Sequence, residues 1–171
     1  MTTVAYDGKE MAADSQATSE NIKTYTTKIF KGPNYILGFS GPIDEGYVFK
    51  AILEEEMKNK DAKLSKGFTA LVWWDSGEIE EYYNSMVPVP VIDKYAALGS
   101  GMSIALAAMY SGKTAREAVE IAKKLDVYTG GKVISYSWDK IKKGKKKKNE
   151  SIEPSDIQEP VCKVSGGAEQ A

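Results

Sequence analysis

The residue with the most distinctive chemistry in this sequence is Thr2, which directly follows Met1. Methionine aminopeptidases remove an initial Met that precedes a small residue, so we expect Thr2 to become the first residue. Its α-amine, with a pKa of about 7.7–8.0, is then partly uncharged near neutral pH and can activate the hydroxyl of the same residue for attack on a carbonyl. Many intracellular proteins begin with Met-Thr without catalytic consequence, so the rest of the chain has to support this hypothesis.

The reaction classes open to this chain are restricted because it contains no histidine and one cysteine, Cys162. It cannot build a Ser-His-Asp triad, a Cys-His dyad or a histidine-based zinc site. A hydrolase of this composition needs an amine, a carboxylate or a metal-bound water as its base. The absence of histidine therefore favours the Thr2 amine, and this chemistry requires neither a metal nor an organic cofactor.

The length and composition indicate one soluble globular domain. The chain has 171 residues, of which 42% are hydrophobic, and this is enough to bury a core. Its net charge of -1 argues against a general nucleic-acid binder and against a membrane-surface protein. No apolar leader is present and no apolar run approaches the roughly 18 residues of a membrane span, so we expect a cytoplasmic protein.

Hydrophobic periodicity predicts a series of strands interrupted by three helices. The expected strands cover residues 2–7, 9–14, 28–30, 35–39, 68–74, 78–85, 94–101 and 132–138. The expected helices run from Pro42 or Ile43 to Met57, over 102–111 and over 115–126. The polar, Thr-rich segment 15–27 is expected only to lead from the first hairpin into the second. Strands at both ends with helices between them predict mixed layers, and hence an α+β architecture.

The composition changes near residue 140, so we place the domain at 2–139. Residues 140–150 form a lysine-rich run, KIKKGKKKKNE, and the sequence beyond them is rich in Ser, Glu, Pro and Gly. This composition predicts a basic and then polar disordered tail over 140–171. The lysine run could contact nucleic acid or an acidic partner, but the balancing acids beyond it favour a solvated tail.

Four segments of the chain carry motifs whose order is informative. They are TTVAYDGKEMAADSQAT, KIFKGPNYILGFSG, ALGSGMSIALAAM and TAREAVEIAKKLD, and together they span residues 2–138. In this order, around an N-terminal Thr, they resemble the HslV-like and proteasome β-subunit family of N-terminal-nucleophile threonine peptidases. The resemblance implies a four-layer αββα sandwich, the fold of N-terminal-nucleophile hydrolases, and a catalytic Thr as the first residue of the mature chain.

The resemblance also implies the main parts of a catalytic centre. Thr2 would be the nucleophile and, through its amine, the general base. Lys28 matches the family's catalytic lysine, whose charge would lower the pKa values of the hydroxyl and the amine, and Asp14 matches the acid that holds this lysine in place. Gly38 matches the glycine whose backbone N–H stabilises the tetrahedral oxyanion. Without this context, Lys28 and Asp14 would be interpreted as an ordinary surface pair.

Other residues match supporting positions of the family. Ser100 and Asp126 match a serine and an aspartate near the amine, with Thr129 as a further partner. In the family, the segment that corresponds to 17–27 helps to line the specificity pocket, and it is shorter here than in HslV. The residues that we expect to contact substrate are Ala17, Thr26, Ile36 and Ser40.

The resemblance favours a threonine-type endopeptidase that cleaves peptide bonds through an acyl-enzyme on Thr2. It also implies a homo-oligomeric ring that acts on peptides or unfolded proteins. Family members usually receive unfolded chains from an ATPase unfoldase, but the resemblance does not establish that partner for this chain. Two alternatives remain: a stand-alone amidohydrolase acting on a small amide, and a catalytically inactive ring-forming scaffold. A monomer or dimer with an open cleft would favour the first alternative, and retention of Met1 would favour the second.

Overall fold

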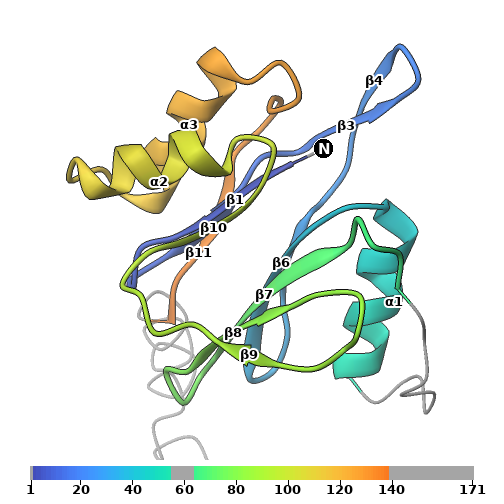
Figure 1. Ribbon diagram of the computed structural model, residues 1–171, viewed down its shortest axis with the longest axis vertical. Coiled ribbons are helices and arrows are strands. Elements are labelled where there is room, and N and C mark those ends of the chain that lie inside the picture. The colour runs from blue at the N-terminus through green and yellow to red at the C-terminus, as the bar shows by residue number, and fades with distance from the viewer. Residues whose placement is uncertain (1, 55–63, 139–171) are drawn as a thin grey trace, which may run out of the picture. The chain divides into compact units, whose positions relative to one another are not determined.

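The computed structural model describes residues 2–54 and 64–138 (Figure 1). Within these residues the strands are β1 (Thr3–Tyr6), β2 (Met11–Ala13), β3 (Gln16–Ser19), β4 (Ile22–Tyr25), β5 (Ile29–Lys31), β6 (Tyr35–Ser40), β7 (Thr69–Trp74), β8 (Ile79–Tyr82), β9 (Val89–Pro90), β10 (Ala96–Gly99) and β11 (Ile134–Tyr136). The helices are α1 (Ile43–Leu53), α2 (Met102–Tyr110) and α3 (Ala115–Leu125). The last positions predicted for the first helix, 55–57, and the predicted tail, 140–171, lie outside the described residues.

Two antiparallel sheets form the centre of the domain. The first has the strand order β10-β1-β2-β11, and the second has the order β5-β6-β7-β8-β9. A separate hairpin pairs β3 with β4. Thr3 at the start of β1 lies opposite Gly99 of β10, and Val4 lies opposite Ala13 of β2. The beginning of the chain is therefore placed inside a sheet, with a neighbouring strand on each side.

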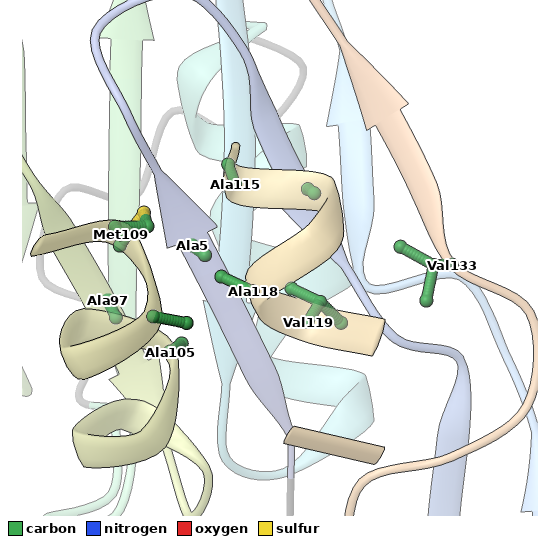
Figure 2. Close-up of a cluster of buried hydrophobic side chains, with 10 residues drawn as sticks. Ala5, Ala97, Ala105, Met109, Ala115, Ala118, Val119 and Val133 are labelled. Atoms are coloured by element: carbon green, nitrogen blue, oxygen red, sulfur yellow. The ribbon is translucent and has the colours of Figure 1, made fainter. Parts of the chain in front are cut away.

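Helices cover the outer faces of both sheets, which gives the four-layer αββα order that the resemblance predicts (Figure 1). Short apolar side chains join α2 and α3 to the first sheet, and alanines predominate among them (Figure 2). The residues labelled in that cluster are Ala5, Ala97, Ala105, Met109, Ala115, Ala118, Val119 and Val133. On the second sheet, Phe49 of α1 packs against Phe68, which stacks on Phe39 of β6. None of the helices within the described ranges is long and apolar enough to cross a membrane.

The inner faces of the two sheets pack against each other. A Cβ atom at Gly38 of β6 would lie 2.6 Å from Val4 Cγ1 and 3.1 Å from Met11 Sδ, so the sheets approach closely there. The rings of Tyr6 and Trp73 meet edge to face at 5.1 Å. Because side chains alternate along a strand, Val4 and Tyr6 face the second sheet, whereas Thr3 and Ala5 face the helices.

The hairpin β3–β4 is the main departure from the predicted elements, because it lies in segment 15–27, where no strand was expected. All four residues of β4 are exposed, and Ile22 and Tyr25 are each 66% exposed. A strand that buries neither face has no need for alternating apolar and polar residues, so periodicity gives no signal for it. The prediction of a simple connection was therefore wrong for this segment.

Candidate active site

The start of β1 lies at the centre of the candidate site. Thr2 is only 1% exposed, and Thr3 is fully buried. The backbone N–H of Thr3 donates to Asp14 Oδ1 at 2.9 Å, and the N–H of Asp14 donates to the carbonyl of Thr3 at 3.2 Å. These bonds extend the pairing of β1 with β2 by one residue beyond Val4 and Ala13. The ladder between the two strands thus sets the position of the Thr2–Thr3 peptide.

The carboxylate of Asp14 is held by four donors. Its Oδ1 accepts the Thr3 N–H and lies 2.9 Å from Lys28 Nζ, while its Oδ2 accepts the N–H groups of Gln16 at 3.1 Å and Gly130 at 2.9 Å. Both side chains of the Lys28–Asp14 pair have 0% exposure. The interpretation as an ordinary surface pair is therefore wrong, and the donors compensate for burying the carboxylate charge.

Lys28 lies immediately before β5, and its ammonium also donates to the carbonyl of Gln16. Burial lowers the pKa of Lys28, and the charge and hydrogen bond of Asp14 offset part of this shift. Since Asp14 Oδ1 contacts both Lys28 and the Thr3 N–H, the ammonium lies beside the Thr2–Thr3 peptide. A cation in this position can stabilise negative charge that develops on a nearby oxygen.

A second polar group comes from the loop after α3. Asp126 Oδ2 accepts the hydroxyl of Ser100 at 2.6 Å and the hydroxyl of Thr129 at 2.5 Å, and Oδ1 accepts the N–H of Tyr128 at 3.2 Å. Burial raises the pKa of Asp126, but these hydrogen bonds outweigh burial, so its pKa lies below the ordinary value. The carboxylate is therefore ionised near neutral pH.

The two polar groups are joined by the loop 126–131 and by β1. On one side, the side chain of Gln16 donates to the carbonyl of Val127 at 3.1 Å. On the other side, Thr3 Oγ1 lies 2.6 Å from Thr129 Oγ1. The structure thus connects the predicted residues Asp14, Lys28, Ser100, Asp126 and Thr129 to the strand that begins after Thr2. Among the described residues, no group of three or more His, Cys, Asp or Glu side chains is placed to hold a metal ion.

Comparison with known proteins bears on the fold. No protein-family model matches the chain, and no curated protein does either. Among solved structures, BPH from Thiobacillus denitrificans is similar with a TM-score of 0.61 and 20% identity, over 79% of this chain and 96% of that one. The same protein in complex with epoxomicin gives a TM-score of 0.59 and 17% identity over the same shares. HslV from Trypanosoma brucei gives a TM-score of 0.59 and 20% identity, over 79% of this chain and 97% of that one. The chain has the HslV fold.

Within this HslV fold, Gly38 lies in the interior of β6. It is opposite Ile29 of β5 and Leu71 of β7. The N–H of the next residue, Phe39, donates to the carbonyl of Lys28 on the β5 side. Because successive residues of a strand direct their N–H groups to opposite sides, the Gly38 N–H is directed towards β7. The close packing against Val4 and Met11 shows that Gly38 allows the two sheets to approach, and its role as the oxyanion donor stays a prediction.

The end of β6 offers a better-placed amide. Gly41 follows the last residue of β6, Ser40, and has a φ of 125°, which favours glycine. In the part of the chain that the structure describes, no residue accepts a hydrogen bond from the Gly41 N–H. A Cβ at Gly99 would lie 1.9 Å from the Thr2 carbonyl oxygen and 3.0 Å from Ser40 Oγ, which places the end of β6 beside Thr2. The Gly41 amide thus lies at the end of β6, the part of the strand that is beside Thr2.

The residues predicted to contact substrate fall into two groups. Ala17 and Thr26 belong to the hairpin region and are half-buried, and the N–H of Thr26 donates to the carbonyl of Ser15 at 2.9 Å. Ser40 is 7% exposed and lies near Thr2. Ile36, however, has 0% exposure within β6. The contact of Ile36 with substrate stays a prediction, which its burial in a central strand does not favour.

Sequence reasoning did not identify Thr3, Gln16, Gly130 or Gly41 as parts of the site. The first three act through backbone groups or buried hydrogen bonds, which leave no motif. A Cβ at Gly130 would lie 2.2 Å from Gln16 Oε1, so this glycine is required by a contact between distant segments. For Gly41 a signal existed, because Ser40-Gly41-Pro42 interrupts the strand pattern.

Proposed function

We propose that this chain is a threonine-type endopeptidase of the HslV and proteasome β-subunit type, with Thr2 as its nucleophile after Met1 has been removed. The observation that carries the proposal is the fully buried Lys28–Asp14 pair, because Asp14 Oδ1 also accepts the N–H of the residue after Thr2. A buried lysine beside the first residue supplies a cation in a chain that has no histidine. The HslV fold supports the proposal by analogy.

The proposed reaction begins when Thr2 Oγ1 adds to the carbonyl carbon of the substrate and its proton moves to the Thr2 α-amine. Lys28 stabilises the negative charge that develops on Oγ1. The Gly41 N–H stabilises the oxyanion of the tetrahedral intermediate. The Thr2 ammonium then gives its proton to the leaving amine as the peptide C–N bond breaks. Water, deprotonated by the Thr2 amine, then adds to the ester carbonyl. The bond between the acyl carbon and Oγ1 breaks, the Thr2 ammonium returns its proton to Oγ1, and the acyl group leaves as a carboxylic acid.

The second polar group supports the same residue in this proposal. The Asp126 carboxylate receives two hydroxyl groups and carries a negative charge near neutral pH. A negative charge near the Thr2 amine favours its protonated form after it has accepted the hydroxyl proton. Ser100 and Thr129 hold this carboxylate in place through their hydrogen bonds.

We also propose that copies of the chain form a homo-oligomeric ring that acts on peptides or unfolded proteins, with an ATPase unfoldase as a partner. The support is the fold shared with HslV from Trypanosoma brucei. Native mass spectrometry of the full chain measures the number of copies directly. A monomer or dimer would contradict the ring and favour a small amide as the substrate.

The nucleophile is tested by intact-mass measurement after incubation with epoxomicin, the ligand present in one of the similar structures. An epoxyketone offers a ketone to the hydroxyl and an epoxide to the amine, and it adds without losing a leaving group. We expect a chain that begins at Thr2 to gain one inhibitor mass. Thr2→Ala should gain none, and a chain carrying one extra residue before Thr2 should gain none, because its Thr nitrogen is an amide.

The outcomes separate the remaining interpretations. Absence of an adduct on folded wild type that begins at Thr2 would contradict the peptidase and favour the inactive scaffold. An adduct on Thr2→Ala would show that another residue reacts. If the adduct forms but unfolded proteins are not cleaved, the stand-alone amidohydrolase becomes the better interpretation.

A further inference from the structure

Thr3 is in contact with both polar groups of the site. Its N–H donates to Asp14 Oδ1 at 2.9 Å, and its carbonyl accepts the Asp14 N–H at 3.2 Å. Its side-chain hydroxyl lies 2.6 Å from the hydroxyl of Thr129. Thr3 has 0% exposure, so these contacts are made in an interior where unpaired polar groups are costly.

The direction of the hydrogen bonds along this side of the site can be assigned. An ionised carboxylate only accepts, so the one hydroxyl proton of Thr129 is donated to Asp126 Oδ2. Thr129 Oγ1 therefore has no second proton to give to Thr3. The Thr3 hydroxyl must be the donor of the 2.6 Å contact, which produces an ordered chain from Thr3 through Thr129 to Asp126.

The Thr3 side chain points away from the face on which a substrate would bind. Alternation along β1 places Thr3 with Ala5 on the helix side, and a Cβ at Gly101, just before α2, would lie 2.1 Å from Thr3 Oγ1. The preceding residue, Thr2, then has the opposite orientation, towards the second sheet. Thr3 consequently acts on the reaction through the placement of Thr2 and not through contact with substrate.

We propose that Thr3 is a positioning residue for Thr2. Its hydroxyl, which donates to Thr129, holds the Thr2–Thr3 peptide next to Asp126, and its backbone hydrogen bonds hold the same peptide next to Asp14. This inference rests on the proposed function. A β-branched apolar residue of the same shape would preserve the packing of β1 but would lose the hydroxyl. Serine would preserve the hydroxyl but would lose the methyl group.

These two substitutions separate positioning from packing. The rate of epoxomicin adduct formation should be measured by intact mass on full chains that begin at Thr2, for wild type, Thr3→Val and Thr3→Ser. We expect Thr3→Val to react about tenfold more slowly, which corresponds to one lost hydrogen bond. Thr3→Ser should react at close to the wild-type rate. The opposite order, with Val active and Ser impaired, would overturn the inference in favour of packing.

Two additions keep the test valid if Thr3→Val folds less well. Thermal unfolding of each variant measures its folded fraction, on which the reaction rates are compared, and a double-variant cycle tests whether Thr3 acts through Thr129. If Thr3 acts through Thr129, the double variant Thr3→Val/Thr129→Val should react no more slowly than the slower single variant, because both changes break the same chain. Additive losses would overturn the inference.

Two outcomes separate this inference from the proposed function. A wild type that forms no adduct would overturn the proposed function as well. A wild type that forms the adduct at the same rate as Thr3→Val would overturn only the role of Thr3.

Discussion

The ammonium of Lys28 lies 2.9 Å from Asp14 Oδ1, and neither side chain is exposed to solvent. A buried ion pair contributes little net stability, because the cost of removing two charges from water offsets their attraction. The pair is more readily explained by what lies next to it, since the same carboxylate oxygen accepts the N–H of Thr3. The charge of Lys28 is thus held beside the first peptide of β1.

Replacing Lys28 tests both the fold and the proposed chemistry. Lys28→Met keeps a similar length but leaves the Asp14 charge buried without its cation, so we expect the free energy of unfolding to fall by about 3–5 kcal/mol. We also expect no epoxomicin adduct on the folded fraction. Urea denaturation and intact mass measure the two effects. Lys113→Met is the matched control, because its pair with Glu117 is about half exposed and should contribute little to the free energy of unfolding. Full reactivity of folded Lys28→Met would remove the main support for the proposed function.

The pH dependence of stability should report the lowered pKa of the Asp126 carboxyl. Its pKa is lowered from the ordinary 3.8, so the folded state favours the ionised form, and this stability is fully present above pH 3.8. As the pH falls through the lowered folded-state pKa, the contribution is lost. Wild type should therefore lose more stability than Asp126→Asn between pH 6 and the acid range, as measured by urea denaturation at each pH. Equal losses in the two proteins would contradict the hydrogen-bond network around Asp126.

The close packing at Gly38 predicts a change in stability on substitution. A Cβ at this position would lie 2.6 Å from Val4 Cγ1, so Gly38→Ala should lower the free energy of unfolding by about 1–3 kcal/mol through overpacking. Adding Val4→Ala should restore part of this loss. Gly67→Ala is the control, because nothing lies within 4 Å of its Cβ position. If Gly38→Ala unfolds like wild type but loses adduct formation, the result would favour Gly38 as the oxyanion donor over a packing role.

The N-terminus of α3 is held by a residue from the first hairpin. Asp7 Oδ2 accepts the N–H of Ala115 at 2.9 Å, and its Oδ1 accepts the N–H groups of Lys9 and Glu10. Asp7→Ala should lower the free energy of unfolding by about 1–2 kcal/mol, the range for losing a helix cap. Thermal or urea unfolding checks this. Asp75→Ala, in the turn between β7 and β8, is the control, because no described hydrogen bond uses its carboxylate, and an equal loss there would argue against the capping role.

Local sequence was sufficient to predict the helices and strands that have a clear hydrophobic pattern or a clear helix-capping motif. Helix α3 was predicted at 115–126 and found at Ala115–Leu125, with the capping box of Thr114 and Glu117 at its start. Strand β7 was predicted at 68–74 and found at Thr69–Trp74. These elements are detectable because burial of one helix face, or of a whole strand, imposes a pattern on neighbouring residues. The hairpin β3–β4 was missed, because β4 is exposed along its whole length and β3 buries only Gln16.

What the sequence by itself determined is the available chemistry: a Thr in second position, no histidine, and a lysine and an aspartate in matching motifs. What only the tertiary structure decided is which of these groups meet. Lys28 and Asp14 are buried together, and Thr3 meets Thr129 from 126 residues away. Gly38 and Gly41 look equivalent in the sequence, yet one amide is directed into the sheet and the other lies free at its end. The reason is physical: residue types set the possible donors, acceptors and charges, but burial and hydrogen-bond partners arise only when distant strands are paired and two sheets are packed.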